Sequence, residues 1–400
     1  MKRIEGTERA DWRAKAEAAG FTFHEMHGAP YWDETHAYAF SLEEIEAGIE
    51  DPCTELHGMC REAAARIASD ESLMERLCIP EAHRDLVAGS WAAGEPELYG
   101  RMDLSWGGTG PAKLLEYNAD TPTALYEAAD FQWSWLEEAR AAGLIAEGAD
   151  QFNRIFEALA ERLAAIFELG ADLHFAAAAG SAEDYATVET LAYAAREAGL
   201  GAHYTDLERI GITTAGQLAD GEGRVIGALF KLYPWEDMLR DPFAEAIGPS
   251  GCRILEPAWK ALVSNKGILP VLWEMFEGHP NLLPAFFEAD WTAGAEAALR
   301  AEARGLLGAG TASKPIFSRE GAGVRLMGPA GEAIAASEDA AYDAHPRVVQ
   351  ALAPLPEVAG MRPVLGAWIV GEACVGLGIR EDASPITGDM SRFVPHLIAP

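Results

Sequence analysis

The 400-residue sequence has few cysteines and no long apolar run. Its five cysteines form no CxxC pair and are odd in number, so neither a disulfide framework nor a zinc site is indicated. No stretch reaches the roughly 18 apolar residues that a membrane span requires. The charged N-terminus MKRIEGTERADWRAKAEAAG also lacks the apolar segment of a signal peptide. We therefore expect a cytoplasmic protein with no membrane contact.

Basic residues are scarce as well. The chain has 31 Lys and Arg against 63 Asp and Glu, and its formal net charge is −32. Nucleic acids are bound by clustered basic side chains, so this balance argues strongly against a nucleic-acid partner. A cationic partner is compatible with the charge, although an acidic surface also serves solubility alone. The oligomeric state is not indicated.

The composition is that of a globular protein, with 49% hydrophobic and 24% charged residues. A chain of this length is expected to form two or three domains. Residues 1–100 carry segments of helical period, such as DWRAKAEAAG and SLEEIEAGIEDPCTELHGMCREAAARIASDESLMERL, and predict a mostly helical region. We expect two further regions, 101–250 and 251–400.

From residue 124 onward, the sequence pattern predicts both helices and strands. Residues 124–169 are again of helical period. They precede an α/β unit that consists of the strand LHFAAAAG, the loop SAED, the helix YATVETLAYAAREAGL and the strand GAHYTD. Such a unit predicts a parallel sheet. Further strands are expected at RVIGALFKLY, CRILEP, KPIFS, VRLM and GAWIVG, so the fold class is mixed α+β.

A hairpin between residues 101 and 118 carries polar side chains that a core would not hold. RMDLSW and KLLEYN alternate with period two around the turn GGTGPA. Symmetric pairing places Asp103 opposite Glu116 and Arg101 opposite Asn118, all on one face. Two carboxylates directly across a ladder repel each other unless a cation lies between them or one is protonated.

Two carboxylates and an amide oxygen are hard ligands that suit Mg²⁺, and Arg101 would offer a fixed cation to a phosphate. An ordinary surface hairpin is an equally good interpretation of the spacing. A glycosidase-like acid pair is a weaker one, because Arg101 would keep both carboxylates ionised.

The stretch ADTPTALYEAADF follows the hairpin. Asp120, Thr121 and Thr123 precede a helical pattern, with Pro122 at a position that a first helical turn tolerates. The pattern predicts that one of the three caps this helix. Exposed amides at a helix start also bind carboxylates or phosphates, so Thr121 and Thr123 have a ligand-binding interpretation besides capping.

The motif R-x-D followed by E-Y-N-A-D-T-P-T resembles the glutathionylspermidine synthase family, which are C–N ligases with an ATP-grasp fold. EPAWKALVSNKGILPVLW at 256–273, KPIFSREGAGV at 314–324 and GLGIRED at 376–382 occur in the family's order, so the resemblance covers roughly residues 12–398. It implies an ATP-grasp nucleotide-binding region at 251–400. A pre-ATP-grasp-like α/β region with the hairpin at 101–250 and the helical region at 1–100 would precede it.

The resemblance also implies roles for individual residues. It places Mg²⁺ on Asp103, Glu116 and Asn118, and ATP on Arg101, Lys266, Lys314, Glu320, Gly321, Gln350, Leu352 and Arg380, with the two arginines as catalytic groups. Thr121 would contact the thiol-peptide substrate, and Thr123 is a second candidate beside it. By themselves these signals are weak, since a single lysine is more often a surface charge and glycines 321 and 323 only permit close approach to phosphates.

Two departures concern the substrates. A family glutamine that contacts ATP aligns with Val364, and the acidic pair that receives the polyamine aligns with Ala182 and Glu183. Asp184 and Glu236, the latter in KLYPWED, are candidate substitutes, although each could equally be a helix cap or a surface charge. In bifunctional members an amidase domain precedes the synthetase. The 400 residues are too few to contain it as well, so we expect a synthetase-like region only.

The resulting expectation is an ATP- and Mg²⁺-dependent carboxylate–amine ligase that acts through an acylphosphate on a small-molecule or peptide acid and an amine. Glutathione and spermidine are only what the family suggests. A carboxylate near the amine, such as Glu183, could take the ammonium proton. The alternative is a non-catalytic ATP- or peptide-binding protein, which Ala182 and Val364 would favour. A polysaccharide hydrolase is a more distant alternative and would bind no nucleotide.

Overall fold

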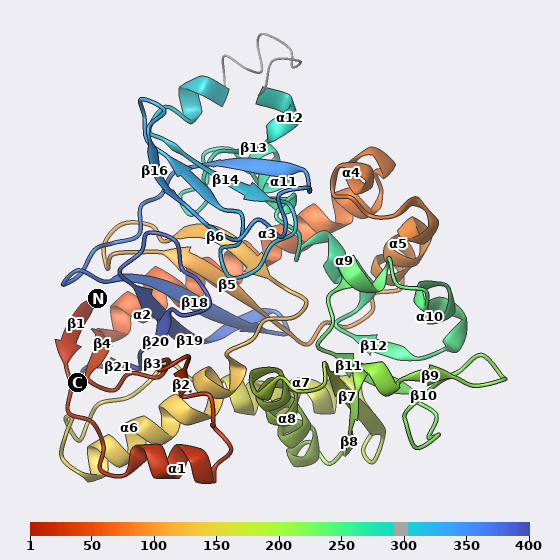
Figure 1. Ribbon diagram of the computed structural model, residues 1–400, viewed down its shortest axis with the longest axis horizontal. Coiled ribbons are helices and arrows are strands. Elements are labelled where there is room, and N and C mark those ends of the chain that lie inside the picture. Colours follow the sequence, from red (N-terminus) through yellow and green to blue (C-terminus); the bar gives the residue numbers. More distant parts are fainter. Residues whose placement is uncertain (292–302) are drawn as a thin grey trace.

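A computed structural model describes residues 1–291 and 303–400 of the chain. In the described part, a five-stranded sheet of order β20-β19-β18-β5-β6 runs through the middle of the molecule (Figure 1). A second sheet of order β13-β17-β14-β15-β16 lies above it in this view, and a third of order β12-β11-β7-β8 lies at the lower right.

The strand bounds follow these sheets. The middle sheet contains β5 (Tyr99–Ser105), β6 (Lys113–Asn118), β18 (Arg362–Val370), β19 (Ala373–Asp382) and β20 (Arg392–Phe393). The upper sheet contains β13 (Ala285–Phe287), β14 (Thr311–Pro315), β15 (Arg325–Met327), β16 (Ala333–Ala336) and β17 (Arg347–Ala351). The third contains β7 (Asp172–Ala177), β8 (Gly201–Asp206), β11 (Ala228–Lys231) and β12 (Arg253–Leu255).

Smaller sheets join β1 (Lys2–Glu5), β4 (His36–Phe40) and β21 (His396–Ile398), β2 (Glu25–Met26) and β3 (Ala29–Pro30), and β9 (Gly211–Ile212) and β10 (Leu218–Ala219). The α-helices are α1 (Trp12–Ala18), α2 (Leu42–Ile45), α3 (Asp51–Ala68), α4 (Glu71–Arg76), α5 (Arg84–Ala92), α6 (Gln132–Ala141), α7 (Ile155–Ile166), α8 (Ala182–Glu197), α9 (Trp235–Met238), α10 (Ala244–Ser250), α11 (Ile268–Met275) and α12 (Glu288–Trp291). Short π-helical turns span Glu46–Glu50 and Glu127–Phe131, and 3₁₀ turns span Glu81–His83, Leu207–Arg209 and Ala258–Leu262.

The hairpin prediction is confirmed to the register. β5 and β6 pair antiparallel with Arg101 opposite Asn118 and Asp103 opposite Glu116. β18 lies on the other side of β5 and places Gly366 opposite Asp103. The parallel sheet is confirmed too, because β7 pairs parallel with both β8 and β11, and β11 with β12.

Two predicted helix starts are wrong. SAED is not a loop: the Ser181 hydroxyl accepts a hydrogen bond from Asp184 N and caps α8, which begins at Ala182. After the hairpin, helical residues begin only at Leu125, so Pro122 lies outside the first turn. Ala124 with φ 63° immediately precedes this helix, and none of Asp120, Thr121 and Thr123 occupies the cap position. The carboxylate of Asp120 instead accepts hydrogen bonds from the third sheet and α9, described below.

Other strands differ in extent from the prediction. β14 starts three residues before KPIFS, and Gln350, expected as a nucleotide contact, lies inside the strand β17. Residues 1–100 contain the strands β1 to β4 as well as helices. Strands such as β1 and β17 were not predicted.

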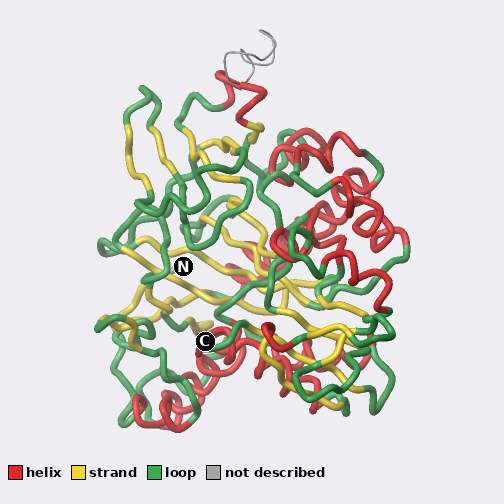
Figure 2. Tube along the Cα trace, turned by 45° about the vertical axis from the view of Figure 1, so that its right-hand side comes forward, coloured by secondary structure: helices red, strands yellow, loops and turns green. Residues whose placement is uncertain are grey.

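Two large hydrophobic clusters hold the elements together. One contains residues from α3, the middle sheet and α11, such as Leu56, Leu377 and Leu272; the other surrounds α6 to α8 and the parallel sheet, with Phe175 and Trp368. Figure 2 shows strands running through the middle between two groups of helices. Both clusters include residues from 1–100, 101–250 and 251–400, and the boundaries at 100 and 250 stay a prediction. No helix in the described residues is both long and apolar enough to cross a membrane.

Candidate active site

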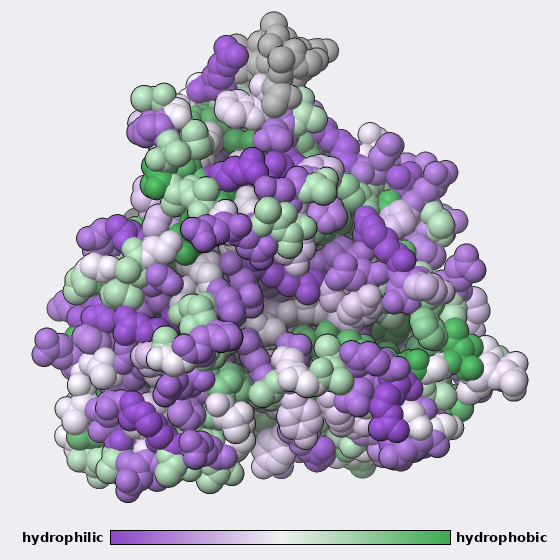
Figure 3. All heavy atoms as spheres, in the orientation of Figure 1, coloured by the Kyte–Doolittle hydropathy of each residue, from purple (hydrophilic) through white to green (hydrophobic). Residues whose placement is uncertain are grey.

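A cavity of about 740 Å³ lies between the middle and upper sheets, and the face in Figure 3 is hollowed near its centre. Its wall brings together nearly all of the residues that the sequence singled out. These are Arg101, Asp103, Glu116, Asn118, Thr121, Thr123, Asp184, Glu236, Lys266, Lys314, Glu320, Gly321, Gln350, Leu352 and Arg380. Of the expected residues, Glu183 alone is not part of the described wall.

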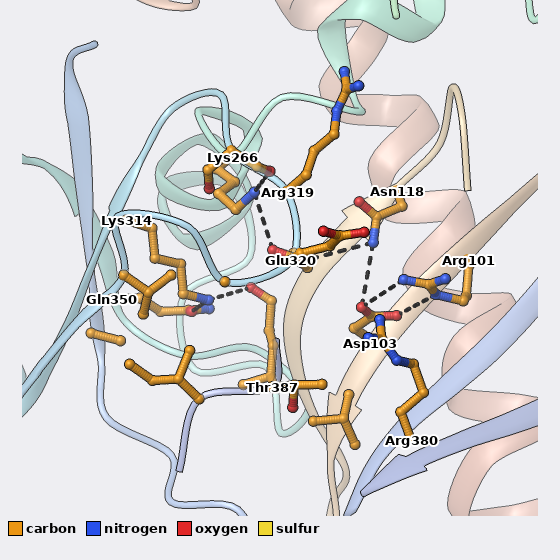
Figure 4. A pocket seen from close by; sticks show the side chains of 18 of the residues that line it. Arg101, Asp103, Asn118, Lys266, Lys314, Arg319, Glu320, Gln350, Arg380 and Thr387 are labelled. Atoms are coloured by element: carbon orange, nitrogen blue, oxygen red, sulfur yellow. Dashed lines mark hydrogen bonds and ion pairs between the residues drawn. The ribbon is translucent and has the colours of Figure 1, made fainter. Parts of the chain in front are cut away.

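The hairpin face carries the candidate metal ligands (Figure 4). Arg101 donates to Asp103 from Nε to Oδ1 at 2.7 Å and from Nη2 to Oδ2 at 3.0 Å. The Asn118 amide lies between the two carboxylates, with Nδ2 3.4 Å from Asp103 Oδ2 and 3.3 Å from Glu116 Oε1. Burial would lower the pKa of Arg101, but Asp103 outweighs it and raises that pKa. Arg101 therefore remains a fixed cation on the face that carries the two acids.

Glu116 is paired with a lysine from the other side of the cavity. Lys266 Nζ lies 3.2 Å from Glu116 Oε2 and donates to Ser318 O at 2.7 Å. Burial opposes the ionisation of Glu116, yet Lys266 and Lys314 outweigh it and lower its pKa to about 2. The carboxylate is thus available as an anionic ligand at neutral pH.

Lys314 extends from β14 into the cavity between the two sheets. Its Nζ donates to Leu115 O at 2.8 Å and to Gln350 Oε1 at 2.9 Å, while Gln350 Nε2 donates to Leu114 O at 3.0 Å. Burial lowers the pKa of Lys314 to about 8, even though Glu116 works against this. Among the described residues no carboxylate lies at hydrogen-bond distance from this buried ammonium, which favours an incoming anion such as a phosphate.

The loop that follows β14 covers one side of the cavity. A Cβ on Gly321, which has φ +69°, would lie 2.6 Å from Thr387 O, so only glycine fits here. Glu320 also has a positive φ of 51°. Arg319 was missed by the sequence reasoning, although it lies within the quoted KPIFSREGAGV; its Nη2 donates to Glu236 Oε1 of α9 at 2.8 Å. This pair joins the loop to the opposite wall.

The acidic candidates lie near the start of α8. Asp184 is in the cavity wall, and Glu183 hydrogen-bonds to Thr123, which is in the wall too. Burial and the neighbouring Glu127 raise the pKa of Glu183 to about 7. A carboxyl group with this pKa exchanges a proton near neutral pH.

Further wall residues had no sequence signal of their own. Arg362 and Thr387 line the cavity, and Gly366 leaves room for the Arg101 side chain, because a Cβ there would lie 2.8 Å from Arg101 Cδ. Val364, the departure from the family pattern, lines the cavity as well.

The size of the cavity and the charges that line it are compatible with a nucleoside triphosphate and Mg²⁺. Its volume lies within the roughly 300–1,000 Å³ of ligand pockets. Six basic and five acidic side chains line it, in a chain whose acids outnumber its bases two to one, so anions are tolerated here. No group of three or more His, Cys, Asp or Glu in the described part is arranged to hold a metal. The donor set is two carboxylates and an amide, which suits Mg²⁺ when phosphate oxygens complete its shell.

Comparison with known proteins gives a consistent picture. A family model described as "Glutathionylspermidine synthase preATP-grasp" matches residues 3–399. A Haemophilus influenzae protein provisionally named as an acid–amine ligase is 36% identical over 420 aligned residues, which cover 100% of both chains. Trypanothione synthetase of Crithidia fasciculata is 28% identical over 85% of this chain and 53% of its own length. The bifunctional glutathionylspermidine synthetase/amidase of Escherichia coli is 26% identical over 92% and 60%.

A solved structure shares the fold. The glutathione synthetase-like effector of Globodera pallida, in its apo form, superposes with a TM-score of 0.55 at 12% identity, over 90% of this chain and 89% of that chain. The mixed α/β architecture is therefore of the glutathione synthetase-like, ATP-grasp type, as expected. The relatives' names indicate an amine ligase, and the chain belongs to the glutathionylspermidine synthase family.

Proposed function

We propose that the chain is an ATP- and Mg²⁺-dependent carboxylate–amine ligase that joins a glutathione-like peptide to a polyamine or another amine. The observation that carries this proposal is that two buried lysines, four arginines and a magnesium-type donor set meet in one cavity. ATP would supply the γ-phosphoryl group that converts the carboxylate into an acylphosphate; the amine nitrogen then attacks the acyl carbon and phosphate leaves.

At the phosphate end of the cavity, side chains would neutralise the charge of the ATP phosphates and hold them in position. Asp103, Glu116 and Asn118 would hold Mg²⁺, as the chemistry of their oxygens favours. Lys266 and Lys314 would bind phosphate oxygens. Arg101 and Arg380 act as the catalytic groups in this proposal, because fixed guanidinium groups stabilise the charge that spreads over a transferring phosphoryl group.

The nucleotide would extend from there toward the upper sheet. Glu320 and Gly321 belong to the loop over the phosphates, and the backbone at Gln350 and Leu352 follows the base. Residues 251–400 form the nucleotide-binding region in this proposal, with the hairpin and α/β region of 101–250 and the region of 1–100 before it.

The substrates would lie at the other end of the cavity. Thr121 and Thr123 offer hydroxyl groups to the peptide acid, while Glu183, Asp184 and Glu236 offer carboxylates to the amine. Glu183 is suited to take the ammonium proton, since burial and Glu127 raise its pKa to about 7.

The test is Mg²⁺-dependent ADP release by purified protein across a panel of thiol peptides and amines, with amide product followed by mass spectrometry. Release that needs one acid and one amine, and is lost in Glu116→Ala, is the expected result. ATP binding without release for any pair would contradict the proposal and favour a non-catalytic ATP-binding protein. An exposed ion-pair variant, Glu189→Ala, is the matched control, since Glu189 pairs with Arg196 on the surface of α8.

A further inference from the structure

A buried ion pair lies directly behind the substrate end of the cavity. The carboxylate of Asp120 and the ammonium of Lys231 are each 1% exposed, and Lys231 Nζ lies 2.5 Å from Asp120 Oδ1. The other oxygen, Oδ2, accepts a hydrogen bond from Trp235 N at 2.7 Å. Asp120 follows β6, Lys231 ends β11, and Trp235 begins α9. One carboxylate therefore joins the middle sheet, the parallel sheet and α9.

The residues next to this pair form two different parts of the cavity wall. Thr121 and Thr123 continue the chain after Asp120, and Glu236 follows Trp235; all three line the cavity. Glu236 in turn accepts a hydrogen bond from Arg319 at 2.8 Å. The loop after Asp120 and the start of α9 are thus connected through the two oxygens of one side chain.

The remaining contacts hold the loop by its backbone. Tyr99 Oη donates to Pro122 O at 3.2 Å, and Arg101 Nη1 donates to Thr123 O at 2.8 Å. Trp235 is fixed as well, because its Nε1 donates to Glu256 O at 3.0 Å and Lys231 Nζ lies 4.7 Å from its ring centroid. The Asp120 carboxylate thus sets the loop relative to α9 through Trp235 N, and the ion pair with Lys231 at the end of β11 holds that carboxylate in place.

We propose that Asp120 and Lys231 are positioning residues that fix the distance between the two walls on which the acid and the amine bind. The identity of the two substrates rests on the proposed function. The connection between the two walls is independent of it. Neither residue touches the cavity, and each acts through its neighbours. A misplacement of about 1 Å between reacting groups costs about a hundredfold in rate, so loosening this pair affects both substrates and leaves the nucleotide in place.

The experiment compares Asp120→Asn with Asp220→Asn. Asp220 is the control, because its carboxylate is also buried, 2% exposed, and pairs with a basic side chain, the half-exposed Arg224, at 2.6 Å outside the cavity wall. Lys231→Met removes the same ion pair from its cationic side and serves if Asp120→Asn folds poorly. The probes are ATP, glutathione and spermidine. We expect Asp120→Asn or Lys231→Met to lower kcat/KM for both glutathione and spermidine by about a hundredfold and to change the KM of ATP by less than about twofold, with no such change in Asp220→Asn.

Hydrogen exchange followed by mass spectrometry provides a second arm that needs no turnover. Peptides covering residues 119–126 and 233–240 should lose protection together in Asp120→Asn and keep it in Asp220→Asn. If only one of the two segments loses protection, or if Asp120→Asn and Asp220→Asn lower Tm without a difference in kcat/KM for the two substrates, the inference is overturned. A wild-type protein inactive with every substrate pair would contradict the proposed function alone, because the exchange arm still decides the inference.

Discussion

Lys266 and Glu116 form an ion pair at 3.2 Å across the cavity. The expected phosphate-binding lysine and an expected magnesium ligand thus neutralise each other in this structure. Mg²⁺ on Glu116 would compete with Lys266 for this carboxylate and would leave the ammonium free to bind a phosphate, so we expect metal and nucleotide to bind together.

Glu116→Ala separates metal binding from nucleotide binding. We expect kcat for ADP release to fall by about 10²–10³-fold, as when a group that stabilises transition-state charge is lost. ATP without Mg²⁺ should bind at least as tightly as to the wild type, because Lys266 loses its competing partner. Calorimetry with ATP in the presence of EDTA measures this, and a large loss of metal-free ATP affinity would contradict it.

The affinity for ATP should depend on pH through Lys314. Burial lowers the pKa of this lysine to about 8 from an ordinary 10.5, so the cationic form prevails below pH 8 and is lost as the pH rises above it. A bound phosphate favours the cation, and binding therefore takes up a proton above pH 8. We expect the Kd for ATP to increase by up to about tenfold per pH unit between pH 8 and 10. Lys314→Arg should flatten this profile, whereas a flat wild-type profile would count against a phosphate contact.

Gly366→Ala tests whether the position of Arg101 matters. The added Cβ would lie 2.8 Å from Arg101 Cδ, so the Arg101 side chain must shift, which disturbs its hydrogen bonds to Asp103. We expect a loss of about a hundredfold in kcat with an almost unchanged Tm, since the strand accepts alanine. Gly227→Ala is the control, because a Cβ there meets no atom within 4 Å. Equal kcat of Gly366→Ala and Gly227→Ala would contradict a catalytic role that depends on the position of Arg101.

Glu183→Gln tests the proposed base. With the wild type, the rate of amide formation should rise through about pH 7, where Glu183 loses its proton. The variant should lose this limb and about 10²–10⁴-fold in rate. Hydroxylamine is largely uncharged at neutral pH and needs no base, so hydroxamate formation should survive in the variant. An equal loss with both nucleophiles would assign Glu183 a role in binding or folding instead.

The sequence alone was sufficient for the parts of the fold that local patterns encode. Period-two alternation around GGTGPA determines which side chains of β5 and β6 share a face, so the register of Asp103 and Glu116 could be predicted. The parallel α/β unit was equally clear. The helix starts were harder to predict. The Ser181 hydroxyl caps α8 by accepting a hydrogen bond from the backbone N–H of Asp184, and this S-x-x-D signal lies within the segment that was predicted to be a loop.

Long-range contacts were beyond the reach of the sequence patterns. Asp120 resembles an N-cap residue by its neighbours, but its carboxylate is taken by Lys231, 111 positions later in the chain. The pairing of β18 with β5 brings Gly366 beside Arg101, and no spacing in either segment indicates it. Arg319 belonged to a quoted motif, yet only the fold places Glu236 within its reach.

Isotope transfer tests the central claim most directly. The acid substrate of an active pair is labelled with ¹⁸O in its carboxylate, and the phosphate released with ADP is analysed by mass spectrometry. An acylphosphate route carries one labelled oxygen from each carboxylate into phosphate as the amide forms. Unlabelled phosphate, or ADP release without any amide, would contradict the account of this chain as a carboxylate–amine ligase.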